Sequence, residues 1–230
     1  MAQLDRFSKI AKNYGELFSE VFDVQELDYK QLQTSMFEQV SKLGYDENTP
    51  VLDIGVGDGK TSEAFVNAGY ANLTGLDLNP EMLEQTRAKY GDKITLVQGD
   101  ATDLQAFSTG QFPVVITATT VHNIAKVDRK KFWAEMLRLQ PKVLVMADKV
   151  TDPDPATHEA SFKSEVEAIH KVFGRRHNLP EAEQVWVDHY DYDERERMEI
   201  TEIEMALGRN YDIEIVYESG MNKTVVCKRK

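Results

Sequence analysis

The chain has 230 residues, 41% of them hydrophobic, which is enough to bury one substantial core. Its formal net charge of −12 disfavours binding to a phosphate backbone, so nucleic acid is not an expected partner. The single cysteine, Cys227, excludes an intramolecular disulfide and a cysteine-based zinc cluster, and we expect it to be a small core residue. The sequence shows no signal-peptide pattern and no run near the roughly 20 apolar residues that span a bilayer, so we expect a cytoplasmic protein.

The first 149 residues predict helices followed by a regular alternation of strands and helices. Apolar residues at helical spacing predict helices over 4–22 and 29–43. Asn79 is the expected N-cap of a helix that begins at Pro80. Strands are expected at 51–54, 73–76, 94–98, 114–117 and 143–146, and the other helices at 61–68 and 129–139. This alternation predicts an α/β fold with a doubly wound, mostly parallel sheet.

The pattern changes after residue 149. Residues 150–208 are polar and mostly helical, without a convincing strand. Two strand signals follow at 211–217 and 223–228, joined by a turn at Ser219-Gly220. Because so short a link forces the two strands to pair antiparallel, we expect the sheet to finish in a hairpin.

The most informative segment is a glycine-rich turn that follows the first predicted strand. A β-prone run ends in an acid, three glycines follow at positions 55, 57 and 59, and a helix comes next. A strand that leads through glycines to a helix N-terminus is a binding place for a nucleotide-like ligand. A P-loop would need a glycine where Ile54 stands, and a dinucleotide fingerprint would need one where Lys60 stands. Asp77 does lie where a ribose-binding acid belongs, so the dinucleotide site is the nearer of these two alternatives.

The third candidate ligand is S-adenosylmethionine. The stretch Asp53-x-Gly55-x-Gly57-x-Gly59 resembles the first motif of the class I S-adenosylmethionine-dependent methyltransferases. Three later stretches resemble the second-, third- and fourth-strand motifs of that family, and one early stretch resembles its leading helix. These are, in order, Leu76-Asp77-Leu78-Asn79, Gln98-Gly99-Asp100-Ala101, residues 112–117 and residues 7–14.

The resemblance implies a Rossmann-like, seven-stranded sheet and a set of donor-binding residues. In the family the second-strand acid, here Asp77, holds both ribose hydroxyls, and the third-strand acid, here Asp100, meets the adenine amine. Glycines let the backbone approach the methionine part of the ligand, and a carboxylate that accepts from a diol forms strong, charge-assisted hydrogen bonds. The full set of expected cofactor-binding residues is Tyr14, Asp53, Gly55, Gly57, Gly59, Asp77, Leu78, Met82, Asp100, Ala101 and Thr117.

The same resemblance implies methyl transfer to a small-molecule acceptor. His122, just after the fourth strand, is the candidate general base, with the alternatives that it packs under the adenosine or caps the next helix. Asn123 is a candidate for orienting the acceptor. The layout from Asp148 onward also resembles carboxy-S-adenosylmethionine synthases, which would use a carboxylated donor, and a non-catalytic S-adenosylmethionine-binding protein is a further alternative.

The polar region 150–208 supplies lid candidates but no metal site. The four histidines in this region lack a fixed helical pairing of ligands, so we expect no metal. The cluster 175–177 (Arg-Arg-His) either binds an anionic group or ends a helix. Aromatic residues expected near the pocket are Tyr14, Phe18, Phe162, Phe173, Trp186 and Tyr190.

We expect a single methyltransferase domain over 1–230. Its parts are N-terminal helices or lid (1–45), a cofactor-binding core (46–149), a helical insert (150–208) and the hairpin (209–230). The expected partner is a small molecule, with no membrane, and a homodimer is left open.

Overall fold

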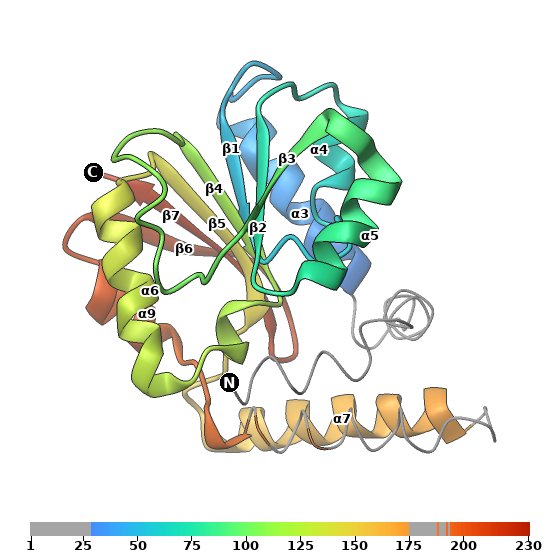
Figure 1. The fold of residues 1–230 in the computed structure, drawn as a ribbon. Helices are drawn as coiled ribbons and strands as arrows, with labels where there is room; N and C mark the ends of the chain where they lie inside the picture. The colour runs from blue at the N-terminus through green and yellow to red at the C-terminus, as the bar shows by residue number, and fades with distance from the viewer. Residues whose placement is uncertain (1–28, 175–187, 189–191, 193) are drawn as a thin grey trace.

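One seven-stranded sheet organises the molecule (Figure 1). The computed structural model describes residues 29–174, 188, 192 and 194–230. The strands lie in the order β3-β2-β1-β4-β5-β7-β6. Strands β1 to β5 are parallel, and β7 runs antiparallel to both β5 and β6. Their bounds are β1 Val51–Ile54, β2 Leu73–Asp77, β3 Ile94–Gln98, β4 Val114–Ala118, β5 Val143–Lys149, β6 Tyr211–Ser219 and β7 Asn222–Arg229.

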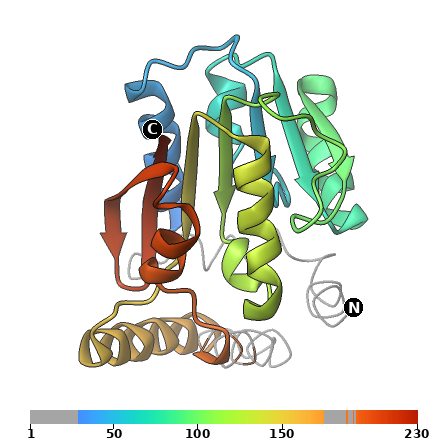
Figure 2. The same cartoon turned by 90° about the vertical axis from the view of Figure 1, so that its left-hand side faces the viewer.

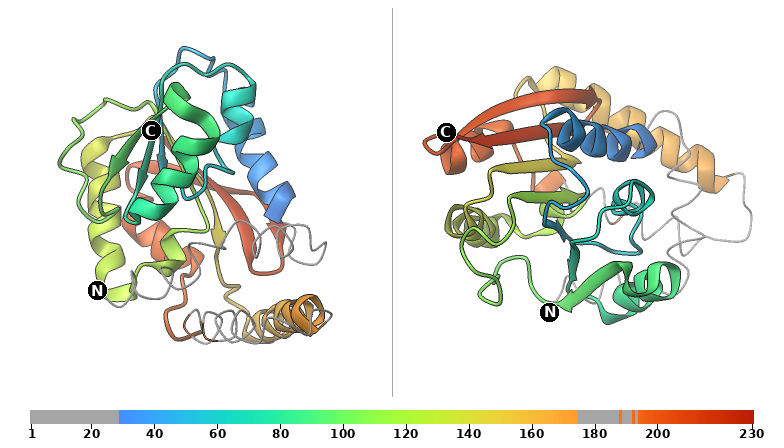
Figure 3. Two further views of the ribbon diagram at one scale, coloured as in Figure 1. Left: turned by 45° about the vertical axis from the view of Figure 1, so that its right-hand side comes forward. Right: turned by 90° about the horizontal axis from the view of Figure 1, so that it is seen from above.

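Helices cover both faces of the sheet and one of its ends. Helices α3, α4 and α5 lie on one face, and α6 and α9 lie on the other (Figure 3). Helix α7 crosses the end of the sheet at which the parallel strands finish (Figure 2). The helices are α3 Tyr29–Lys42, α4 Glu63–Asn67, α5 Pro80–Tyr90, α6 Lys126–Leu139, α7 Pro155–Gly174 and α9 Ile200–Leu207, with short 3-10 turns η2 Gly91–Lys93 and η3 Val121–Asn123.

The two faces of the sheet each carry a hydrophobic core. Successive side chains of a strand point to opposite faces, so β4 and β5 contribute to both cores. Ile116 and Val145 pack towards α3 and α4, whereas Val115 and Met146 pack towards α6 and α9. Both faces of these central strands are therefore buried, which is why their sequence is apolar without alternation.

Strand order reverses between β1 and β4, and this reversal positions the site. β2 and β3 lie on one side of β1, and β4 and β5 lie on the other. β1 and β4 are neighbours in register, with Ile54 opposite Thr117. The turns that leave these two strands diverge to opposite faces, which opens a crevice at the carboxyl edge of the sheet.

Most predicted elements are confirmed, including the bounds of β1 and β3, the C-terminal hairpin and the burial of Cys227 in β7. The Asn79 cap is also confirmed, because its side chain accepts a hydrogen bond from the backbone N–H of Glu81 at 2.8 Å. Helix α4 is shorter than predicted. Helix α6 begins at residue 126 rather than 129, where its first N–H meets Glu196, a partner 70 residues away, at 2.5 Å. A cap supplied from so far along the chain leaves no local sequence signal.

The predicted helix over 4–22 lies outside the described residues. The division into lid, core, insert and hairpin stays a prediction. In the part of the chain that the structure describes, no helix combines the length and hydropathy needed to cross a membrane.

Candidate functional site

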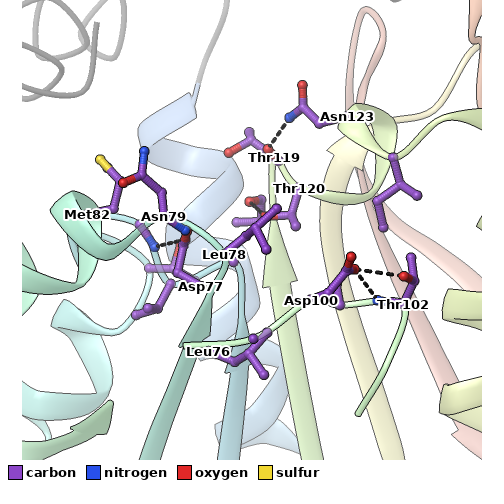
Figure 4. Close-up of a pocket in the computed structure, with 18 of the residues that line it drawn as sticks. Leu76, Asp77, Leu78, Asn79, Met82, Asp100, Thr102, Thr119, Thr120 and Asn123 are labelled. Atoms are coloured by element: carbon purple, nitrogen blue, oxygen red, sulfur yellow. Dashed lines mark hydrogen bonds between the residues drawn. The ribbon is translucent and has the colours of Figure 1, made fainter. Parts of the chain in front are cut away.

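A cavity of about 300 Å³ opens at the carboxyl edge of the sheet, where the strand order reverses. The turns after β1, β2, β3 and β4 form its wall, and Gln33 of α3 and the start of α6 complete it. Figure 4 shows the side chains around this cavity. Of the expected cofactor-binding residues, Gly55, Gly57, Asp77, Leu78, Met82, Asp100 and Ala101 line the cavity.

The glycines of the turn after β1 have different roles. Gly55 has φ +76°, and a Cβ there would lie 2.1 Å from Oγ1 of Thr120, so the β4 turn can pack against it only because it is glycine. Gly57, with φ +55°, faces the cavity, and a Cβ there would lie 3.6 Å from Cε of Met82. Gly57 is therefore the position at which ligand can lie against bare backbone.

Asp77 joins two turns of the cavity wall. One carboxylate oxygen accepts from the N–H of Gly57 at 2.9 Å, and the other accepts from the N–H of Asn79 at 2.8 Å (Figure 4). Burial raises the pKa of Asp77, while these backbone hydrogen bonds oppose that rise. Each carboxylate oxygen has a second lone pair, so the group can still accept from hydroxyls in the cavity.

Asp100 lies across the cavity on the turn after β3. One of its carboxylate oxygens accepts from the N–H of Thr102 at 2.8 Å and from its hydroxyl at 2.7 Å. These two bonds orient the carboxylate and leave its second oxygen available. Leu78, Met82 and Ala101 add apolar surface to the cavity wall.

Three expected ligand residues lie behind the cavity wall rather than in it: Asp53, Gly59 and Thr117. Thr117 donates to the carbonyl of Ile54 at 2.9 Å and so ties β4 to β1. A Cβ at Gly59 would lie 2.4 Å from the Tyr90 ring, so this glycine makes room for α5.

Asp53 is a buried acid beneath the glycine turn. Its Oδ2 accepts from the hydroxyl of Ser62 at 2.7 Å, and Oδ1 is buried without a hydrogen-bond partner. Burial is the main cause that raises the pKa of Asp53 to about 7. The hydrogen bond from Ser62 lowers this pKa, and the nearby charge of Asp77 raises it further. Asp53 therefore supports the turn from beneath, and its burial favours the protonated form.

The loop after β4 is held by Asp148, a fully buried residue of β5. Thr119, with φ +46°, is strained and lines the cavity. The Asp148 carboxylate accepts from the N–H groups of Thr120 at 3.2 Å and Val121 at 2.8 Å, and it also bonds Nδ1 of His122. One buried acid thus fixes the turn and orients the imidazole.

His122 does not line the large cavity. It lines a separate, small pocket of about 10 Å³, which holds one water at most. His158, Glu194 and Arg197 also line this pocket. Burial of Glu194 disfavours its charge, but Arg197 and His158 hold its pKa below the usual value. No group of three acidic, histidine or cysteine residues in the described ranges is arranged to hold a metal ion.

Arg129 connects the cavity loop to the segment before α9. This fully buried side chain donates to the carbonyls of Ile124 at 3.0 Å, Glu196 at 2.7 Å and Arg197 at 2.7 Å. Its Nε and Nη2 also donate to the Glu202 carboxylate at 2.9 and 3.1 Å. Every partner except Ile124 comes from more than 60 residues away, so the sequence offered no sign of this role.

Sequence reasoning also missed Gln33, Thr119 and Thr120 as cavity residues. The two threonines follow a buried parallel strand, and that position was the signal available for them. Asn123 does line the cavity, and its amide donates to the carbonyl of Thr119 at 2.9 Å. Phe162 lines the small pocket. Several expected residues lie outside those whose side chains are described. They are the other aromatic residues (Tyr14, Phe18, Phe173, Trp186 and Tyr190), the cluster 175–177 and His189.

Comparison with known proteins gives the same assignment as the motifs. Residues 51–141 match a family model described as a methyltransferase domain. No sequence among the curated proteins matches the chain. A chain from a complex that contains the Haloferax volcanii Trm112 methyltransferase activator is 16% identical with a TM-score of 0.65, over 98% of this chain and 96% of that one.

Two further structures share the fold. Magnesium protoporphyrin IX methyltransferase from Synechocystis PCC 6803, with bound S-adenosylhomocysteine, is 13% identical with a TM-score of 0.65 and 97% of both chains covered. A SAM-dependent methyltransferase from Aquifex aeolicus is 15% identical with a TM-score of 0.54, over 84% of this chain and 88% of that one. Residues 51–141 therefore match a methyltransferase domain, and the chain shares the fold of these S-adenosylmethionine-dependent methyltransferases.

Proposed function

We propose that this protein transfers a methyl group from S-adenosylmethionine to a small-molecule acceptor. One observation carries the proposal: a single cavity of about 300 Å³ combines bare glycine backbone with two oriented carboxylates on successive strand ends. S-adenosylmethionine supplies an activated methyl group on a cationic sulfonium, so alignment of donor and acceptor can provide much of the catalysis.

The proposed roles of the donor-binding residues follow from their positions. Asp77 accepts from the ribose diol, because its carboxylate is oriented by two backbone N–H groups and lines the cavity. Asp100 accepts from the adenine amine with the oxygen that Thr102 leaves available. Leu78 and Met82 supply apolar surface against the donor, and Gly57 lies against its methionine part.

Acceptor binding is proposed for the side of the cavity formed by the loop after β4. Asn123 lines the cavity there, and His122 lies next to it with its Nδ1 held by Asp148. An imidazole oriented by a carboxylate is suited to take a proton from an O–H or N–H acceptor. This role requires the acceptor to contact the side of the loop that His122 lines. The net charge of −12 supports a small molecule rather than nucleic acid.

The test is a methyl-transfer assay with S-adenosylmethionine labelled on the methyl group. Purified protein is incubated with fractionated small-molecule extract, and S-adenosylhomocysteine and labelled products are followed. We expect both to form together and, at a donor concentration near the wild-type Kd, to fall strongly when Asp77 is replaced by alanine. Donor binding without release of S-adenosylhomocysteine from any fraction would indicate a binding protein instead.

Mass spectrometry of ligand that copurifies with the protein addresses the donor itself. We expect the mass of S-adenosylmethionine or S-adenosylhomocysteine. The mass of a carboxylated donor would contradict the proposed reaction and favour a carboxy-S-adenosylmethionine synthase.

A further inference from the structure

An open groove of about 490 Å³ runs between α6 and α9, on the face of the molecule that carries these two helices. It is separate from the donor cavity. Trp133, Ala134, Leu137 and Ala206 contribute its apolar surface. On α6 the groove residues recur at 126, 130, 133/134 and 137, the spacing of a single helix face.

The two most exposed large hydrophobic residues of the described chain belong to these two helices. Met205 is 80% exposed on α9 and lines the groove, and Val127 is 67% exposed on α6, on the same face as Lys130 and Ala134. The other two, Ile215 and Leu43, are only 39% and 36% exposed. An apolar groove beside a protruding methionine is a surface suited to bury apolar area against a partner.

Charges of opposite sign border the groove on its two sides. Lys126 and Lys130 line the groove from α6, where both are exposed, and Glu199 lines it at the start of α9, where it is exposed. Neither lysine forms an ion pair with another residue of the described chain. The surface therefore carries a basic border and an acidic border with an apolar strip between them.

We propose that this groove is the interface of a homodimer, with a second copy of the chain as its occupant. In a two-fold dimer the same patch of both copies forms the interface, and residue i of one copy meets residue j of the other while j meets i. With the axis along the groove, the basic α6 border of one copy faces the acidic α9 border of its partner. Met205 of each copy then enters the groove of the other. Charge complementarity of a surface with itself is the feature that favours a second copy over an unrelated protein.

Sedimentation equilibrium of the purified full chain at about 0.15 M salt tests the proposal, because this ionic strength screens the long-range repulsion between two acidic copies. We expect a concentration-dependent dimer. The variant M205E should weaken dimerisation by at least about tenfold, since it places a charge in the apolar groove. The matched control L43E makes the same chemical change just after α3, away from the groove, and should leave the dimer intact.

A charge swap tests the pairing of the two borders. K130E and E199K should each weaken the dimer, and the double variant should restore it because each copy then carries both reversed charges. Wild-type protein that stays monomeric, or an M205E variant that dimerises as well as L43E, would overturn the proposal. Circular dichroism shows whether each variant is folded. The result is independent of donor binding, so it can fail while the proposed function stands.

Discussion

The donor cavity and the segment that follows β5 are held together by different kinds of interaction. In the cavity, a few carboxylates bind backbone N–H groups of nearby turns, as Asp77 does with Gly57 and Asn79. The region after β5 is held by charged side chains that pair across long stretches of sequence, as Glu202 does with Arg129 of α6 and His158 with Glu194. The cavity is thus a product of local turn geometry, and the insert is a product of long-range charge pairing.

This difference predicts different responses to mutation. A substitution in the cavity should change ligand affinity more than the free energy of unfolding, because few buried charges lose a partner when a cavity residue is replaced. A substitution among the buried charges of the insert should change stability first, because each leaves another charge without its partner.

Arg129→Ala should have the largest effect on the insert. It removes the hydrogen bonds to three carbonyls and leaves the Glu202 carboxylate without its guanidinium partner. We expect a loss of about 3–5 kcal/mol in the free energy of unfolding, measured by urea denaturation. If the folded variant binds S-adenosylhomocysteine with an affinity within about tenfold of wild type, ligand binding does not depend on the charge pairs of Arg129. A loss of less than about 1 kcal/mol in the free energy of unfolding would contradict the role given to Arg129.

His122→Ala tests the boundary between the two regions, because His122 is bonded to Asp148 and lines the pocket beside the insert. If His122 takes the acceptor's proton, turnover should fall by about 10²–10⁴-fold while affinity for S-adenosylhomocysteine changes little. The measurement is turnover with an acceptor identified by the methyl-transfer assay. His122→Gln controls for loss of packing. A folded His122→Ala variant with full turnover would remove His122 as base.

Asp53→Asn tests the support beneath the glycine turn. The folded-state pKa of Asp53 is raised from 3.8 to about 7, so the folded state holds a proton that the unfolded state loses, and stability falls as pH rises from about 4 to 7. The variant lacks this titration. Because a shift of about 3 pKa units is worth about 4 kcal/mol, we expect the variant to be more stable than wild type by about 4 kcal/mol at pH 8 and similar to it near pH 4. If the free energies of unfolding of the two proteins change with pH in the same way between pH 4 and pH 8, the raised pKa of Asp53 is disproved.

Gly57→Ala should have the smallest effect on stability and a selective one on binding. Its positive φ costs roughly 1 kcal/mol for alanine, and the nearest atom to the new Cβ is 3.6 Å away, so the fold should tolerate it. The methyl group narrows the place proposed for the ligand, so affinity should fall about five- to tenfold by calorimetry. Gly69→Ala is the matched control, because φ is +84° there and nothing lies within 4 Å. Equal affinities for the two variants would count against a ligand at Gly57.

The sequence was sufficient for the donor side because its signals are local. Each parallel strand ends in a turn whose residues are adjacent in sequence, so Asp77, Asn79 and Asp100 could be placed at one sheet edge from the strand pattern alone. The sheet and the hairpin were predicted on the same basis and are confirmed. The resemblance to methyltransferases came from the motifs, and residues 51–141 match a methyltransferase domain.

Sequence reasoning was insufficient wherever a role depends on a distant partner. The start of α6 depends on Glu196, and the orientation of His122 depends on Asp148. Asp53 and Thr117 were expected at the ligand but lie behind the wall, because a motif shows which residues share a turn without showing which side chains face the cavity. The assignment of individual site residues, the acceptor and the cytoplasmic location stay predictions.

Calorimetric titration of S-adenosylhomocysteine into wild-type protein and the Asp77→Ala variant tests the central claim most directly. The claim is that the cavity at residues 55–57, 77 and 100 binds the donor. We predict saturable binding to wild type and a loss of roughly 1.5–3 kcal/mol in the variant, as expected when a charge-assisted hydrogen-bonding partner is removed. No binding to wild type, or unchanged affinity in a folded Asp77→Ala variant, would contradict it.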